Sequence, residues 1–335
     1  MLTMKSYSIH CISEAISPIT HASGTSGNES IVSRETVCHD GQLFSVPFLS
    51  GNALRHRSIR EPGSLFLIDR LGLRGKLTLP QLNYLLHGGN LSESTAHENT
   101  RRIADLHRLF PLFRLLGGSL RNQIIGGSLD VWRGTLICRE NLRSLAMLIP
   151  QLESMPLLPA ERLVTNYQYT TGDAVGRNMH NGDETVDREE SSRMIYAGQA
   201  VMRGAFFHHG YVLKHVSELE LGALLLSLRL WQAAGGTIGG SARIGHGRLK
   251  TSLVGVEDRT ELIERYVEHI DANREECLKW LDDAFAKKAE KADGEKSRAE
   301  GRKTRAKSKA SSSAVSNDDI GIKESSVDTG DGCVV

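Results

Sequence analysis

The sequence lacks the cysteine patterns of disulfide scaffolds and of zinc-binding modules. Its cysteines are odd in number, far apart and never spaced C-x-x-C, which excludes both frameworks and favours a reducing compartment. It also lacks an apolar run near the roughly 18 residues of a membrane span, and no apolar signal segment opens the chain. We therefore expect a soluble cytoplasmic protein with no membrane partner. The cysteines are Cys11, Cys38, Cys138, Cys277 and Cys333.

An excess of one charge sign is absent as well. Lysine and arginine number 41 against 40 acidic residues, which excludes a uniformly basic histone-like protein but leaves room for local basic patches. The length of 335 residues predicts about two domains, or one large domain with an insertion. Hydrophobic residues make up 39% of the chain, which is enough for a sizeable core.

Aromatic residues are missing after Phe285. Residues 287–309 instead hold ten lysines and arginines with four acids, and residues 310–335 are rich in Ser, Gly and Asp. Such a segment cannot bury enough apolar surface to offset the entropy of ordering, so we predict a disordered tail over 287–335. It serves as a solubilising extension or as an electrostatic arm for nucleic acid, and the lack of aromatics favours the extension.

Three regions have helical periodicity. Residues 217–234 begin with a Ser-x-x-Glu capping box, carry leucines on one helical face and end at two glycines. Residues 258–288 predict a second helix, and residues 78–116 predict helical stretches broken by a Gly-Gly pair and by Pro111. The core-facing positions expected in the second helix are Leu262, Tyr266, Ile270, Cys277 and Leu281.

Short β-prone segments bounded by Gly, Asn or Pro lie between these helices. Their order lacks the regular βαβ alternation of a doubly wound sheet and predicts a mixed α+β fold. Between residues 170 and 193 the sequence is rich in turn formers and predicts a long hairpin with a mobile tip. The β-prone segments are 7–11, 129–138, 164–170, 193–202 and 249–256.

The glycine-rich run at 235–248 is one candidate phosphate-binding segment. It holds six glycines and two arginines, follows a predicted helix and precedes a predicted strand. This order is the reverse of a P-loop or a dinucleotide fingerprint, and His246-Gly247 replaces the Lys-Ser/Thr that a P-loop needs. Bare backbone N–H groups beside Arg243 and Arg248 suit phosphate oxygens, and tight turns at a sheet edge are the alternative.

A second candidate segment lies at residues 47–60. There a Ser-Gly-Asn turn follows an apolar strand and predicts a helix whose first turns carry Arg55, Arg57 and Arg60. The free N–H groups and the dipole of a helix start favour phosphate, whereas a solvated basic face is the alternative. A third stretch, 101–143, has eight arginines against three acids and admits the same two interpretations.

Catalytic signatures are sparse. The histidine pair at 208–209 has no cysteine or carboxylate at metal-ligand spacing, and no Gly-x-Ser-x-Gly nucleophile elbow is present. The acids Glu29, Glu35 and Asp40 lie in a predicted polar loop, where an exposed carboxylate is usually only solvated. We therefore expect no enzyme activity, no metal and no cofactor.

The order of these features along the chain points to one family. Ser-Pro-Ile-Thr-His at 17–21 follows a first strand, Val-Pro-Phe-Leu-Ser-Gly-Asn-Ala-Leu-Arg stands at 46–55, and a helical insertion, a hairpin, a leucine-rich helix and the glycine run follow. This series resembles the backbone subunit of the RAMP superfamily of class 1 CRISPR systems. Residues 50–56 and the uninterrupted insertion are most similar to the type IV branch, and the resemblance covers about residues 5–255.

The resemblance implies an α+β fold with an RRM-like (ferredoxin-like) palm, a helical insertion, a β-hairpin thumb and the disordered C-terminal tail. In the family, the thumb of one copy wedges against the guide on the next copy and displaces a base at regular intervals. The implied limits are 1–62, 117–160 and 203–286 for the palm, 63–116 for the helical insertion, 161–202 for the thumb hairpin and 287–335 for the tail.

The resemblance also implies a function, that of a guide-RNA-binding subunit that oligomerises along the guide crRNA. Its partners would be the guide, copies of itself in a head-to-tail helical filament, other CRISPR effector subunits, and target DNA or RNA paired to the guide. Motif matching places Asn52 and Arg55 where the family grips the guide backbone. The predicted RNA-binding residues are Ser50, Gly51, Asn52, Arg55, His56, Arg57, Arg60, Met194, Tyr196, Gly239, Gly240, Ser241, Arg243, Gly245, His246 and Arg248.

The sequence departs from the target-cleaving type III relatives. Those carry an Asp in the loop after the first strand, where this chain reads Ser33-Arg34-Glu35, and an arginine cannot replace a carboxylate in acid-assisted RNA cleavage. Ala53 stands where the family has Ser, and His56 where it has Gly. We expect a non-catalytic subunit. The alternatives are a type III-like subunit with target ribonuclease activity through Glu35, and a glycine-loop nucleotide-binding enzyme.

Overall fold

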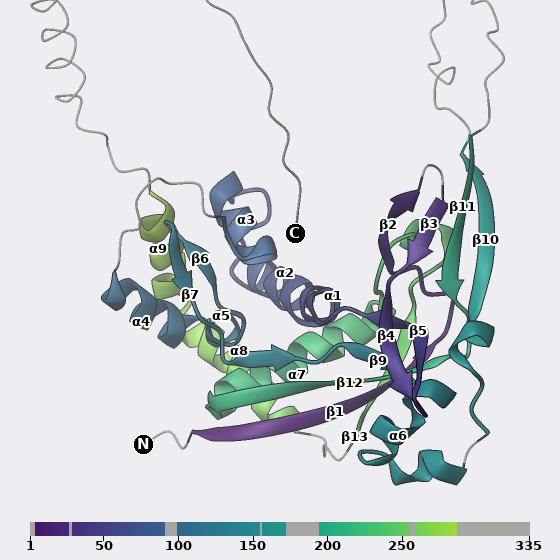
Figure 1. The fold of residues 1–335 in the computed structure, drawn as a ribbon. Helices are drawn as coiled ribbons and strands as arrows, with labels where there is room; N and C mark the ends of the chain where they lie inside the picture. The colour runs from purple at the N-terminus through teal and green to yellow at the C-terminus, as the bar shows by residue number, and fades with distance from the viewer. Residues whose placement is uncertain are drawn as a thin grey trace, which may run out of the picture. The chain divides into compact units, whose positions relative to one another are not determined.

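The computed structural model describes residues 4–26, 29–90, 99–154, 156–171, 194–254 and 259–286 (Figure 1). The predicted hairpin tip and the predicted tail lie outside these ranges. The described residues form a mixed α+β fold with antiparallel sheets and several helices, which confirms the predicted fold class. None of the helices in those ranges combines the length and the apolarity that a bilayer crossing requires.

The large sheet is formed by strands from both ends of the chain. Its strands are β1 (Lys5–Ala15), β4 (Arg34–His39), β5 (Gln42–Leu49), β8 (Leu129–Val131), β9 (Gly134–Leu136), β12 (Phe206–Val216) and β13 (Leu249–Val254). Their order is β13-β1-β12-β9-β5-β4, with β8 also paired to β12. β1 lies between β12 and β13 and is antiparallel to both. Alternate β1 residues, among them Ile9 and Cys11, are buried, as the predicted strand periodicity requires.

Helices form the second layer, and their bounds agree with most of the predicted stretches. Over 78–116 the predicted breaks at the Gly-Gly pair and at Pro111 are confirmed. The longer helices are η1 (Arg55–Arg60, a π-helical stretch that joins α1 to α2), α2 (Glu61–Arg70), α3 (Leu79–His87), α4 (Thr100–Leu109), α5 (Pro111–Leu116), α7 (Glu218–Ala233), α8 (Thr260–Ala272) and α9 (Arg274–Phe285). The short ones are α1 (Gly51–Leu54), η2 (Arg139–Asn141), α6 (Leu142–Ala146), η3 (Pro150–Ser154), η4 (Ala160–Leu163) and η5 (Ala242–Ile244).

Helix α7 is the centre of the core. It packs against β12 and β13 on one side and against α2 and α8 on others (Figure 1). The predicted capping box is confirmed, since the Ser217 N–H donates to the Glu220 carboxylate at the helix start. Because other elements surround α7 on several sides, residues 220–228 are all buried, and the buried side chains do not form a single stripe along the helix.

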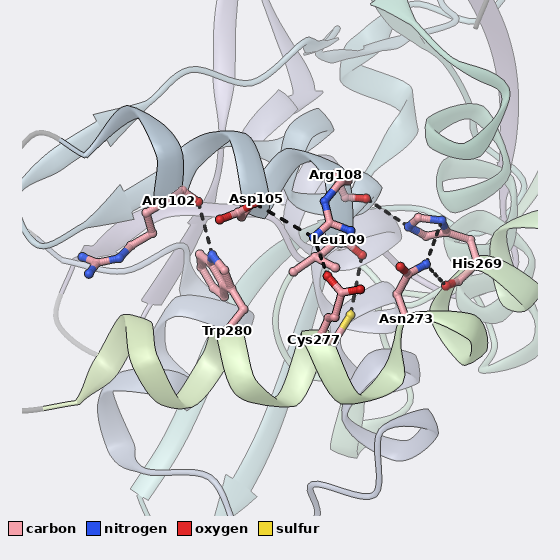
Figure 2. Close-up of polar contacts among 9 residues, drawn as sticks. Arg102, Asp105, Arg108, Leu109, His269, Asn273, Cys277 and Trp280 are labelled. Atoms are coloured by element: carbon pink, nitrogen blue, oxygen red, sulfur yellow. Dashed lines mark hydrogen bonds and ion pairs between the residues drawn. The ribbon is translucent and has the colours of Figure 1, made fainter. Parts of the chain in front are cut away.

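The predicted single helix over 258–288 is wrong, because the chain bends between α8 and α9. Asn273 ends α8, and its side-chain amide donates to the His269 carbonyl oxygen at 2.8 Å. The bend lays α9 along α4, where the Trp280 indole N–H donates to the Arg102 carbonyl oxygen at 3.2 Å (Figure 2). Helical periodicity alone does not reveal such a break, because both helices keep their apolar faces toward the core.

The small sheet holds the described part of the predicted thumb hairpin. Its strands are β2 (Ala22–Ser26), β3 (Glu29–Val32), β10 (Val164–Thr171) and β11 (Met194–Val201), in the order β10-β11-β3-β2. β10 and β11 are antiparallel from Val164 opposite Val201 to Thr171 opposite Met194, which confirms the predicted hairpin strands. β11 also pairs in parallel with β3, so the hairpin is attached to the segment that follows β1.

Three strand predictions need correction. The predicted polar loop is wrong, because Glu29 lies on β3, Glu35 on β4 and Asp40 in the turn between β4 and β5. The single strand predicted over 129–138 is two short strands, β8 and β9. β12, which carries the histidine pair at 208–209, was not predicted. β8, β9 and β12 take their backbone partners from remote strands, which local polarity conceals. β4 instead pairs with the adjacent β5 in a hairpin, and the polar residues of that hairpin hid it.

Candidate nucleic-acid interface

The start of α1 is built by Ser50, the N-cap residue. The Ala53 N–H donates to Ser50 Oγ at 3.2 Å, and no acidic residue stands in the first turn. The Ser50 N–H donates to Nε2 of His21 at 3.1 Å. Burial lowers the pKa of His21, which keeps the ring neutral and this nitrogen available as an acceptor. The helix start is therefore fixed in place and electropositive.

A polar hollow of about 490 Å³ opens at this helix start. Asn52 and Arg55, both predicted from the sequence, line it, and so does Arg133 on the segment between β8 and β9. The Arg133 guanidinium lies 4.6 Å from the centre of the Phe48 ring and pairs with the Glu35 carboxylate. The lining residues are Phe48, Ser50, Gly51, Asn52, Arg55, Leu129, Asp130, Val131 and Arg133.

The basic residues of 47–60 do not share one surface. Arg55 is half-buried and donates to the Leu116 carbonyl oxygen. Arg60 is 8% exposed and donates to the Gly117 carbonyl oxygen at 3.0 Å. Burial, with the nearby Arg55 charge, lowers the pKa of Arg60 to about 10. Arg60 thus supports the turn that follows α5 from inside the fold.

Two further predicted residues of this helix have partners within the chain. Arg57 pairs with Glu61 one turn later, at 2.8 Å. The His56 ring stacks on the His87 ring with their centres 5.9 Å apart. Burial lowers the pKa of His56; the Glu61 charge has a smaller effect that raises it, and nearby cations lower it further. Neither residue is among those that line the hollow.

The glycine loop, defined as residues 238–247, is held against the segment after β1. The Ile238 N–H donates to the Gly247 carbonyl oxygen at 2.7 Å and closes the loop, and the Gly247 N–H donates to the Pro18 carbonyl oxygen at 2.8 Å. Gly239 has φ +72°, and a Cβ there would lie 2.3 Å from the Thr20 carbonyl oxygen. Only glycine therefore fits at this position.

The two predicted segments meet at Thr20 and His21. The Thr20 hydroxyl donates to the Gly240 carbonyl oxygen, and the Gly240 N–H donates to the Thr20 carbonyl oxygen, both at 2.8 Å. The next residue, His21, accepts from the Ser50 N–H at the helix start. Adjacent residues of one short segment thus hold the glycine loop and the hollow side by side.

The predicted residues of the glycine loop differ in exposure. Arg243 on η5 and Arg248 after the loop are exposed, as are Gly240 and Gly245. Ser241 has φ +60°, a left-handed conformation in which Asn, Asp and Gly are commoner than Ser. His246 is half-buried, and its ring meets the Tyr167 ring edge-on with centres 4.7 Å apart.

The β10–β11 hairpin brings together three half-buried tyrosines that we name the tyrosine ladder: Tyr167 and Tyr169 on β10 and Tyr196 on β11. Tyr196 was predicted from the sequence, whereas Tyr167 and Tyr169 were missed. The signal was their spacing of two within a predicted strand, which places both side chains on one face. Met194, also predicted, pairs with Thr171 at the last described rung of the hairpin.

The ion pair between Glu35 and Arg133 bears on whether the site could be catalytic. Glu35, one of three acids considered for catalysis in the sequence, pairs with Arg133, a cation of the hollow that the sequence interpretation did not single out. In the described ranges, no three His, Cys, Asp or Glu side chains come together as a metal site would require. The hollow offers guanidinium groups and the N–H groups of the helix start, and the glycine loop offers the exposed Arg243; these donors suit an anion.

Comparison with known proteins gives a relationship of fold. No family model matches the sequence, and no curated protein matches it. The structure is similar to a chain of a solved structure titled "Type IV-B CRISPR Complex", with a TM-score of 0.50, coverage of 76% of this chain and 92% of that chain, and 17% sequence identity. At this identity the likeness shows that the two chains share a fold.

Proposed function

We propose that this chain is a guide-RNA-binding backbone subunit of a CRISPR effector complex, most like those of type IV. The observation that carries the proposal is the junction at Thr20 and His21, which joins two segments with phosphate-binding chemistry from distant parts of the chain. The fold shared with a chain of a type IV-B CRISPR complex supports the same assignment.

The chemistry of the junction suits the backbone of a single strand. The helix start offers N–H groups, Asn52, Arg55 and Arg133 around a polar hollow. The glycine loop adds bare backbone with the exposed Arg243 beside it. Such contacts bind phosphate and sugar, and they position a strand without reading its sequence. A guide of any sequence can then be held, and base pairing with the guide selects the target.

The proposed role is structural and not catalytic. Glu35, the carboxylate nearest in sequence to the catalytic position of type III relatives, is engaged by Arg133. The Arg133 guanidinium donates to a Glu35 carboxylate oxygen and so occupies an atom that acid-assisted cleavage would need. Copies of the chain would follow one another along the guide in a head-to-tail filament, with other effector subunits at its ends.

The proposal is tested by the salt dependence of RNA binding by the full chain. Arg243→Ala should weaken binding of an oligouridine RNA and lower the slope of log K against log salt by about 0.7, the value for one phosphate contact on a single strand. Arg143→Ala, which removes an exposed arginine of α6, is the matched control and should leave the slope unchanged.

Three results would overturn the proposal. The first is that the chain binds no RNA. The second is that the salt slope is the same for Arg243→Ala as for the unmodified chain. The third is that the chain proves to be an RNA-free monomer or dimer that binds a mononucleotide. The last result would favour the glycine-loop nucleotide-binding enzyme instead.

A further inference from the structure

The tyrosine ladder is a continuous row of aromatic rings that ends at the glycine loop. Tyr169 and Tyr196 stack across the strands with ring centres 5.4 Å apart and planes 16° apart. Tyr167 stacks on Tyr169 at 6.2 Å with planes 11° apart. The His246 ring of the glycine loop then meets Tyr167 edge-on. Four rings from three segments therefore form one row.

The register of the hairpin and a single glycine build this row. Tyr169 is directly opposite Tyr196, which is the closest cross-strand position for two rings. Tyr167 is directly opposite Gly198, and a Cβ there would lie 2.6 Å from the Tyr167 hydroxyl oxygen. The absence of a side chain at Gly198 lets the Tyr167 ring lie across the strand and toward the glycine loop.

Core packing does not explain the row. Of the seven tyrosines of the chain, Tyr84, Tyr211 and Tyr266 are fully buried, whereas the three of the tyrosine ladder are only half-buried. The opposite face of β10 carries exposed polar side chains, such as Gln168. A partly exposed row of π-faces next to phosphate-binding groups matches the way proteins bind single strands without sequence preference, by stacking bases beside a cationic backbone track.

We propose that the tyrosine ladder is a stacking surface for unpaired nucleobases of a single-stranded RNA whose phosphates are held at the glycine loop. The inference rests on the proposed function and adds that this face binds the bases of the strand. Arg243 lies in the glycine loop with His246, and Arg248 follows the loop directly, so exposed cations stand on both sides of the first ring of the row in the chain. Stacking accepts any base, which is what a guide of arbitrary sequence requires.

The test compares the binding of two ligands of equal length, oligouridine RNA and an abasic ribose-phosphate strand, by the full chain and its single-residue variants. Tyr169→Leu should weaken binding of the oligouridine about ten-fold, with an unchanged salt slope, because a base stack and no phosphate contact is lost. The same variant should bind the abasic strand as the unmodified chain does. Tyr169→Phe keeps the ring and should retain the affinity.

Gln168→Leu, on the opposite face of the same strand, is the matched control and should change neither affinity. An equal loss for both ligands, or no loss for either, would overturn the stacking surface while RNA binding itself stands. If the unmodified chain binds neither ligand, the proposed function fails together with the inference.

A second measurement needs no variant and covers the case in which Tyr169→Leu does not fold. The unmodified chain is crosslinked by ultraviolet light to a thiouridine-substituted RNA, and the adducts are located by mass spectrometry. Adducts on Tyr167 or Tyr169 are expected. Adducts confined to peptides outside β10 and β11 would overturn the inference.

Discussion

Thr20 and Gly240 exchange two hydrogen bonds of 2.8 Å, although they are 220 positions apart in the chain. This reciprocal pair fastens the glycine loop to the segment after β1. Its effect extends to the next residue, since His21 holds the Ser50 N–H at the start of α1. The candidate interface is therefore a property of the tertiary fold, and a change at Thr20, which is not among the predicted RNA contacts, should act on RNA binding through the position of the glycine loop.

Gly239→Ala should detach the glycine loop. An alanine Cβ would lie 2.3 Å from the Thr20 carbonyl oxygen at a φ of +72°, so the loop has to move. We expect a loss of about 3 kcal/mol in the free energy of unfolding, from left-handed strain plus an unsatisfied carbonyl, and a clear loss of RNA affinity. Chemical denaturation and RNA titration measure the two effects.

Gly75→Ala, in the loop between α2 and α3, is the matched control. Gly75 has a φ of +71°, but no atom lies within 4 Å of an added Cβ, so only the backbone strain remains. It should cost about 1 kcal/mol. Equal effects of the two substitutions would contradict the importance of the Thr20–Gly240 pair.

Acid should destabilise the fold through His209. This ring is buried, and Nε2 shares a 2.8 Å hydrogen bond with Ser13 Oγ. Burial, with a smaller effect of His208, lowers the pKa of His209 from 6.5 to about 3. Because the pKa in the folded state is depressed, the neutral ring stabilises the fold above pH 6.5, and this contribution is lost progressively as the pH falls from 6.5 toward 3.

Between pH 7 and pH 5 the contribution of His209 should fall by about 2 kcal/mol. His209→Asn should remove that part of the pH dependence, as measured by denaturation at both pH values. His215→Asn is the control, because His215 is exposed and has a φ of +50°, which asparagine tolerates. Identical pH dependence in the unmodified chain and in His209→Asn would show that another group governs the acid response.

Target RNA should remain intact on the assembled complex. Complementary RNA is incubated with complexes that contain either the unmodified chain or Glu35→Ala, and the products are separated by size. We expect no cleavage from either, because the Glu35 carboxylate is engaged by Arg133. Evenly spaced fragments that disappear with Glu35→Ala would establish the ribonuclease alternative.

Removal of residues 172–193 should impair assembly and leave folding intact. Thr171 and Met194 are opposite each other, so a two-residue Asn-Gly turn can join β10 to β11. We expect a folded chain that still binds a short RNA but no longer forms long assemblies on a long one, as measured by light scattering. Deletion of 287–335 is the control and should leave assembly unchanged. Normal assemblies after the hairpin deletion would contradict the thumb assignment.

The elements predicted correctly depend on local signals. The capping box at Ser217 marks where α7 begins, and the leucine spacing that follows it identifies the helix; that all of residues 220–228 are buried depends instead on the elements packed around it. Two of the strands missed, β12 and β3, depend on remote partners instead. β12 carries a polar histidine pair yet lies between β1 and the short strands β8 and β9, and β3 is paired to β11 from a distant part of the chain. No local pattern contains that information.

The features of the candidate site also fall into those that the local sequence indicates and those that depend on how distant segments pack. The Ser-Gly-Asn turn and the glycine run were found from composition and motif order, and their RNA contacts remain predictions. The burial of Arg60, the position of Arg133 at the hollow and the junction at Thr20 all depend on how distant segments pack. Tyr167 and Tyr169 were within reach of the sequence, because their alternation marks one strand face, but only the structure relates that face to His246.

The most direct test of the account is the composition and size of the purified full chain, expressed with and without a CRISPR array transcript. The ratio of nucleic-acid to protein absorbance and the mass from light scattering are measured on the same sample. We predict that the transcript converts the chain into a large particle rich in RNA, with several copies per guide. A small particle free of nucleic acid, even when the transcript is present, would contradict the central claim.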